Sequence, residues 1–213
     1  MHIVLTDILT CPVCGPDFGL IVLARNIEDR RVLEGTLGCP NCERHYPIEG
    51  GLAQLAAGEP LKVGAAEPAD AERAVRIAAF AALQEGWQRS GAGRAPSLLV
   101  GAPAGQAAEL AALLPGTEFI AFADNLGEWP EQPGVNRIMA GDRLPIGSGR
   151  LRAVVLHGGE AGALVAEAAR VLSVAGRLIW LNAPEDAEAT LADAGLQLLA
   201  RDAVNLIAVP SFQ

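Results

Sequence analysis

The four cysteines of this chain constrain its fold more than any other feature. Cys11 and Cys14 form one C-x2-C knuckle, Cys39 and Cys42 form a second, and 24 residues lie between the two knuckles. This spacing lets two thiolates converge on one metal ion, and two knuckles complete a tetrahedral all-sulfur shell for Zn²⁺. The sequence therefore predicts a zinc site built from all four cysteines.

Four protein ligands leave no open position for water, so the predicted site is structural rather than catalytic. Zinc binding then contributes folding free energy to a segment too short to bury a core of its own. Two disulfides are the first alternative. The opening MHIVLTDILT carries no basic region or cleavage signal, so we expect a cytoplasmic chain, in a compartment where disulfides are rare. A redox-active pair is the second alternative, but such a motif usually occurs singly on a βαβ unit.

The residues after the second knuckle sharpen this interpretation. The run from Cys42 reads CERHYPIEGGLAQL, and Ile8 and Leu9 precede the first knuckle. With these motifs, residues 3 to 57 resemble the small zinc-ribbon activator subunit of tRNA, rRNA and release-factor methyltransferases. The resemblance implies a zinc ribbon with a mini-core that includes Tyr46 and Ile48. It also implies a surface for protein interaction in place of an active site.

Composition and charge exclude two classes of function. The chain has 213 residues, of which 51% are hydrophobic, and a formal net charge of −9. Residues 1–60 hold 4 basic and 8 acidic side chains, and the remainder holds 12 and 17, so neither part offers a basic surface for nucleic acid. No apolar run reaches the roughly 20 residues that a membrane helix needs. We expect neither direct nucleic-acid binding nor a membrane span.

The rest of the chain is organised by a break in apolar periodicity. Gly58, Pro60, Gly64 and Pro68 punctuate a stretch without a repeating pattern. We predict a zinc-ribbon domain over residues 1–57, a linker over 58–68 and an α/β domain over 69–213. A helix should occupy residues 69–86, with Asp70 placed to cap its start.

From residue 97 onward, strand and helix patterns alternate. Alternation of this kind predicts a mostly parallel sheet with helices on both faces. The last two strand patterns, LQLLAR and NLIAVP, are separated by only a few residues, which favours an antiparallel hairpin at the sheet edge. The predicted fold is therefore α/β and Rossmann-like, preceded by the small β zinc ribbon.

This order resembles the class I S-adenosylmethionine methyltransferase fold over residues 70–210. The run GDRLPIGSGRLRAVVL is similar to the family's G-D-x-x-x-L-P stretch, and AARVLSVAGRLIW is similar to its R-V-L-K-P-G-G-R-L segment. The resemblance implies a cofactor site at the carboxyl ends of the first strands. Four residues match its positions: Gly101 and Gly105 in the first turn, Asp124 at the ribose and Asp142 at the adenine.

The same comparison predicts that the cofactor site is degenerate. Pro103 stands where the family has the middle glycine, and Leu99 stands where it has an acid. Proline fixes φ and lacks an N–H group, and its ring crowds a turn where the cofactor must come close. For Asp124 a turn or helix-capping role stays open, and for Asp142 a structural role stays open.

His157 follows the predicted fourth strand, at the edge where open α/β sheets bind ligands. It is a weak candidate for an acid-base residue. A histidine that caps the next helix or packs in an empty cleft is the alternative.

Two functional hypotheses follow. The first is a non-catalytic accessory or scaffold protein, a pseudoenzyme with structural zinc that binds a protein partner or itself. The second is an active S-adenosylmethionine-dependent methyltransferase whose substrate site a partner chain completes, with catalysis dominated by positioning.

Overall fold

The computed structural model describes residues 1–82 and 95–211. The N-terminal part holds the 3-10 helix η1 (Ile3–Asp7) and six strands: β1 (Thr10–Cys11), β2 (Gly15–Gly19), β3 (Ile21–Glu28), β4 (Arg31–Gly38), β5 (His45–Glu49) and β6 (Leu52–Leu55). A stretch without helix or strand then leads to α1 (Ala71–Ala82).

The C-terminal part alternates strands and helices as the sequence predicts. Its strands are β7 (Ser97–Val100), β8 (Phe119–Phe122), β9 (Val135–Ala140), β10 (Leu151–His157), β11 (Leu172–Leu181), β12 (Leu196–Arg201) and β13 (Leu206–Pro210). The helices between them are η2 (Ala102–Gln106), α2 (Ala107–Leu113), η3 (Leu126–Glu128), η4 (Glu160–Leu164), α3 (Val165–Val171) and α4 (Ala187–Asp193).

The start of α1 follows the predicted capping. Asp70 Oδ1 accepts hydrogen bonds from the backbone N–H groups of Glu72 and Arg73, at 3.0 and 3.3 Å. A side-chain acceptor at this position satisfies amide donors that have no partner within the helix. The helix begins at Ala71, two residues later than the predicted start at 69, and residues 83–86 of the predicted helix lie outside the described residues.

Eleven of the described strands join into one sheet in the order β12-β13-β11-β10-β7-β8-β9-β6-β5-β4-β3, and β1 and β2 pair antiparallel as a separate two-stranded sheet. Within the C-terminal part, β9, β8, β7, β10 and β11 are parallel, and β13 and β12 form the antiparallel hairpin. Numbered among themselves in chain order, these strands lie in the order 3-2-1-4-5-7-6. The Rossmann-like, methyltransferase-type fold class with an N-terminal β ribbon is thereby confirmed.

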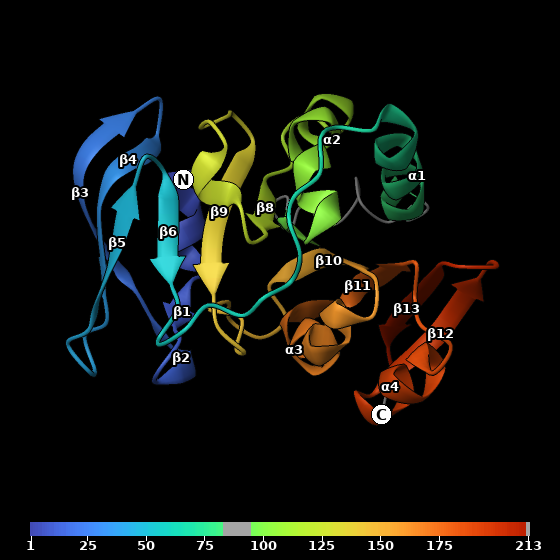
Figure 1. Cartoon of the computed structure of the whole chain (residues 1–213). Helices are drawn as coiled ribbons and strands as arrows, with labels where there is room; N and C mark the ends of the chain where they lie inside the picture. Colours follow the sequence, from blue (N-terminus) through green and yellow to red (C-terminus); the bar gives the residue numbers. More distant parts are fainter. Residues whose placement is uncertain (83–94, 212–213) are drawn as a thin grey trace.

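The ribbon and the C-terminal part share this sheet. Strand β6 pairs in parallel with β9, from Leu52 opposite Arg137 to Leu55 opposite Ala140. The sheet therefore runs without interruption from β3 at one end to β12 at the other (Figure 1). The predicted division into a ribbon domain (1–57), a linker (58–68) and an α/β domain (69–213) stays a prediction. The backbone hydrogen bonds between β6 and β9 join the ribbon to the α/β part.

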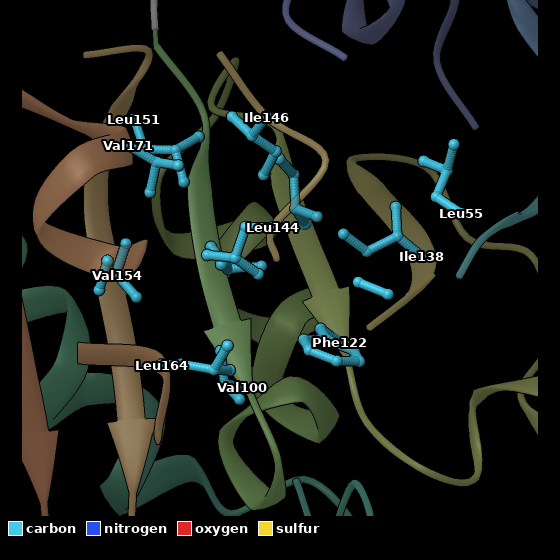
Figure 2. Packing of buried hydrophobic residues seen from close by; sticks show 14 of the residues in the cluster. Leu55, Val100, Phe122, Ile138, Leu144, Ile146, Leu151, Val154, Leu164 and Val171 are labelled. Carbon is cyan, nitrogen blue, oxygen red and sulfur yellow. The ribbon is translucent and has the colours of Figure 1, made fainter. Parts of the chain in front are cut away.

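Alternating side chains give the sheet two apolar faces. Leu98 and Val100 belong to a core that also contains residues of α3, α4 and the ribbon, whereas Leu99 belongs to a core under α1 and α2. In the first core, Leu55 of the ribbon lies beside Ile138 of β9, and Phe122 of β8 belongs to the same core (Figure 2). Each fully buried leucine of this kind stabilises the fold by about 1.5–3 kcal/mol.

A partly buried ionic cluster also holds the ribbon to the C-terminal part. Glu131, in the loop before β9, accepts hydrogen bonds at 3.1 Å from the Met1 ammonium and at 2.5 Å from Arg31 Nε, and forms an ion pair with Arg137 Nη2 at 3.3 Å. Burial alone would raise the pKa of Glu131, but the cations of Met1 and Arg31 outweigh it and hold that pKa below 4.5. Arg137 also donates to the carbonyl of Gly50, so the cluster joins both parts.

None of the described helices combines the length and the apolar character that a membrane crossing requires.

Candidate metal site and cofactor cleft

The four cysteines of the two knuckles come together in the ribbon. All four sulfur atoms lie within 4.8 Å of one another. The Sγ atoms of Cys11 and Cys42 are 3.7 Å apart, and those of Cys39 and Cys14 are 3.8 Å apart. Four ligands at about 2.3 Å from one zinc ion would place their sulfurs roughly 3.8 Å from each other. The geometry therefore fits a tetrahedral Zn²⁺ site and is too open for disulfides.

Neighbouring groups orient the sulfurs. The backbone N–H of Cys14 donates to Cys11 Sγ at 3.4 Å, and Asn41 Nδ2 donates to Cys14 Sγ at 3.2 Å. The Tyr46 hydroxyl lies 3.4 Å from Cys11 Sγ, inside the ribbon core. Hydrogen bonds of this kind fix the direction of a metal ligand. Because the protein supplies four sulfur ligands, the site has the closed form of a structural metal centre.

The first turn of the C-terminal sheet carries the two predicted cofactor glycines. Gly101 follows β7 with φ of 70°, a conformation that favours glycine, and it leads into η2. Pro103 lies within η2 and is buried, as are Ala102 and Gly105. Leu99 is fully buried in the core under α1 and α2. The turn is thus formed, with a proline at its centre and an aliphatic side chain in place of the acid.

The segment of residues 61–67, which we call the strap, lies across this turn. It leaves the ribbon after β6, and the chain there crosses the front of the C-terminal sheet on its way to α1 (Figure 1). The Val63 N–H donates to Asp124 Oδ1 at 3.0 Å, and the Asp124 N–H donates to the Gly64 carbonyl at 3.0 Å. Asp124, the predicted ribose ligand after β8, therefore already has a backbone partner.

Asn125 and the glycine turn bind the second half of the strap. The Ala66 N–H donates to Asn125 Oδ1 at 2.8 Å, and Asn125 Nδ2 donates back to the Ala66 carbonyl at 3.2 Å. The Glu67 N–H donates to the Ala102 carbonyl at 3.3 Å. These bonds bring the strap backbone to the carboxyl ends of β7 and β8.

Both cofactor glycines are needed to admit the strap. A Cβ atom on Gly101 would lie 2.4 Å from the Val63 carbonyl oxygen, and one on Gly105 would lie 1.6 Å from the Glu67 carbonyl oxygen. Real Cβ atoms do not approach so closely, because packed atoms repel steeply below van der Waals contact. Glycines in such a turn usually allow a ligand to come close to the backbone. In this protein the strap backbone takes that position.

Asp142 and His157 lie outside this set of contacts. Asp142 is exposed in the loop after β9 and lines a cavity of about 550 Å³ together with Pro12, Pro60 and Lys62. His157, at the end of β10, lies with its Nε2 atom 2.9 Å from Asn182 Nδ2. Burial and the charge of Arg73 lower the pKa of His157, partly opposed by Glu67. The structure thus brings Gly101, Gly105 and Asp124 together around the strap.

The sequence did not predict the strap contacts or the role of Asn125. The glycines and prolines of the predicted linker mark a break in periodicity and do not indicate where the segment lies. Val63 and Ala66 are only 3% and 4% exposed, and this burial is the feature that distinguishes them from an ordinary linker. The only sign of this burial in the sequence is that apolar residues, Val63 and Ala66, stand inside a stretch without periodicity.

Comparison with a family model agrees with the ribbon. Residues 4–51 match the model of the Trm112p-like protein family, which is 48 of the chain's 213 residues. No curated protein matches the chain.

Three solved structures are similar to part of this chain. The first is the complex between the Haloferax volcanii Trm112 methyltransferase activator and the putative methyltransferase, at 12% identity and a TM-score of 0.44, covering 67% of this chain and 95% of that chain. The second is CalO1, a methyltransferase in calicheamicin biosynthesis, at 14% and 0.44, covering 66% of this chain and 54% of that chain. The third is a putative methyltransferase from Bacillus halodurans, at 18% and 0.40, covering 62% and 70%.

The family match and the strand order identify the parts of the chain. The chain carries a Trm112p-like zinc ribbon, fused ahead of a sheet of the methyltransferase type.

Proposed function

We propose that this protein is a non-catalytic accessory or scaffold protein, in which a zinc ribbon is bound in cis to a methyltransferase-like sheet. The observation that supports the proposal is the strap in the cofactor cleft. Asp124 accepts the Val63 N–H at 3.0 Å, and the two glycines of the turn face strap carbonyls. A cofactor placed by these same residues would overlap the strap, so we infer that the cleft does not serve catalysis.

Structural Zn²⁺ belongs to this proposal. The ion would be held by Cys11, Cys14, Cys39 and Cys42, whose sulfurs already have the spacing of a tetrahedral shell. Its contribution is to crosslink the two knuckles and so to stabilise a ribbon with a small core. We assign it no part in a reaction, because four sulfurs leave no position for water or substrate.

His157 supports the same proposal in a second way. It is the weak acid-base candidate of the sequence, yet its ring nitrogen lies against the Asn182 amide at 2.9 Å. An amide partner fixes the orientation of the ring and offers no charge that would make the histidine a stronger base. We therefore treat His157 as a packing residue at the mouth of the cleft.

An accessory role also needs a surface for a partner, and β3 supports one. This strand forms the free edge of the ribbon, and three apolar side chains along it, Ile21, Leu23 and Ile27, are 57%, 60% and 49% exposed. Edge strands with apolar side chains pair readily with another strand. We propose a second copy of the chain as the partner, so sedimentation velocity should give a dimer that Leu23→Glu converts to a monomer. A monomeric wild type would exclude this partner.

A calorimetric titration tests the proposed function. Zinc-loaded protein is titrated with S-adenosylhomocysteine up to millimolar concentration, with Asp124→Ala and Asp142→Ala measured beside it. We expect no heat of binding in any of the three proteins. Micromolar binding that is lost in Asp124→Ala would contradict the scaffold proposal and favour a methyltransferase whose substrate site is completed by a partner chain.

A further inference from the structure

We propose that the strap is the resident ligand of the cleft: Asp124, Asn125 and the glycine turn form a groove that binds residues 61–67, and strap and nucleoside exclude each other. The inference rests on the proposed function, because it gives the strap the position that a cofactor would take in this cleft. It goes further by assigning the two polar residues after β8 a specific role in peptide binding.

The hydrogen-bond pattern supports recognition of a peptide backbone. Asp124 and Asn125 each make two bonds to the strap, with one donor and one acceptor on either side. Asp124 accepts from Val63 and donates to Gly64, and Asn125 accepts from and donates to Ala66. Paired donors and acceptors of this kind are how proteins bind an extended segment through its main chain.

Burial of the strap residues gives these bonds their strength. Val63 and Ala66 are almost completely buried, and Gly64 between them has φ of 85°, which lets the chain turn without strain. Val63 packs in the core that includes Val100 and Phe122, and Ala66 packs in the core that includes Leu99 and Ala104. The strap therefore contributes to both cores, unlike a linker that only spans a distance.

Both ends of the strap are also fixed. At its start, the Leu61 N–H donates to the Ala140 carbonyl at the end of β9, at 3.0 Å. At its end, Glu67 forms an ion pair with Arg73 of α1 at 2.8 Å. Just beyond it, the Asp70 N–H donates to Gln106 Oε1 at 3.3 Å. A ligand that uses the glycine turn must displace a segment that is held at both ends and at Val63, Gly64 and Ala66 between them.

Mutual exclusion follows from shared atoms. The Asp124 carboxylate that would hold ribose hydroxyls is the group that holds Val63, and the space in front of Gly105 is filled by the Glu67 carbonyl. Binding of a nucleoside therefore weakens binding of the strap, and the strap weakens binding of the nucleoside by the same factor.

Hydrogen exchange of the intact zinc-loaded protein tests the groove. We compare wild type with Asp124→Ala, Asp124→Asn and Asp193→Ala, and follow the amides of residues 61–67 by mass spectrometry. Asp193 is the matched control, an exposed acid at the end of α4 and outside the cleft. Trypsin cleavage after the exposed Lys62 gives a second measure of strap release.

We expect Asp124→Ala to speed exchange of the Val63 amide about tenfold or more, because a hydrogen bond to a charged group is lost. Asp193→Ala should leave it unchanged, and Asp124→Asn should largely restore protection because the amide keeps an acceptor oxygen. The far strands β10 and β11 should stay protected in all variants, which separates strap release from unfolding. Equal exchange in the two alanine variants, or an unprotected strap in wild type, would overturn the groove.

Added S-adenosylhomocysteine separates this inference from the proposed function. If the nucleoside binds and strap exchange accelerates, the scaffold function fails while mutual exclusion holds. If it binds and the strap stays protected, both fail. If nothing binds and the wild-type strap is unprotected, the inference fails and the scaffold function stands. No binding with a protected strap is the result we expect.

Discussion

At the scale of the residue, Gly105 shows most directly how the cleft is used. Its φ lies outside the left-handed region, so an alanine there meets no backbone strain, but its Cβ would lie 1.6 Å from the Glu67 carbonyl oxygen. We predict that Gly105→Ala displaces the strap and lowers the free energy of unfolding by about 1–3 kcal/mol. Gly127→Ala is the control, since nothing lies within 4 Å of its Cβ position. Urea denaturation of both variants measures the difference, and equal midpoints would contradict the account.

Glu131 is the second residue with a definite role. Replacing it with glutamine removes the carboxylate partner of the Met1 ammonium and of the Arg137 guanidinium, whose side chain is 6% exposed, and leaves Arg31 with only Glu118, at 3.8 Å, as a carboxylate partner among the described residues. We expect Glu131→Gln to cost about 2–4 kcal/mol of unfolding free energy, because breaking a buried pair leaves charges uncompensated. The exposed Glu59→Gln serves as the control, and it should change the free energy little.

The contribution of Glu131 to the free energy of unfolding should decrease as the pH falls. Because the pKa of Glu131 is held below its ordinary value of 4.5, its stabilising contribution is fully present above pH 4.5. It is lost as the pH falls through the lowered pKa of the folded state. Denaturation curves of wild type and Glu131→Gln should therefore converge in acid and differ near neutrality. A constant difference at every pH would exclude this role.

At the scale of the element, β6 joins the ribbon to the larger sheet. Ala53 is fully buried and lies opposite Ile48 of β5 on one side and Ile138 of β9 on the other. Proline removes a ladder hydrogen bond in such an interior strand, so we expect Ala53→Pro to destabilise the chain by about 3 kcal/mol or more. Ala57→Pro, in the exposed stretch after β6, should cost far less. Similar thermal midpoints for the two variants would argue against β6 as the joint.

Elements with local signals were the predictable part of this molecule. The cysteine spacing, the alternating strands, the terminal hairpin and the Asp70 cap all depend on neighbours in sequence, and the structure contains each of them. Placement of distant segments was not predictable. The Val63 contact with Asp124 and the Arg31 contact with Glu131 join residues 61 and 100 positions apart. No periodicity encodes such pairs, because they arise only when the sheet is assembled.

At the scale of the whole molecule, zinc should stabilise more than the ribbon. Cys11 and Cys39 belong to the same buried core as Val154 and Trp180 of the far strands, and the sheet is continuous between them. We predict that removing zinc with a chelator lowers hydrogen-exchange protection in β10 and β11 as well as in β4 and β5. Cys39→Ser should reproduce the effect. Unchanged protection in β10 and β11 would show that the two parts fold independently.

The most direct test of the central claim is a crystal structure of the zinc-loaded protein grown with millimolar S-adenosylhomocysteine. We predict that residues 61–67 lie in the cleft, with the Val63 nitrogen about 3.0 Å from Asp124 Oδ1, and that no nucleoside is bound there. Density for a nucleoside against Gly101 and Asp124, with the strap moved away, would contradict it.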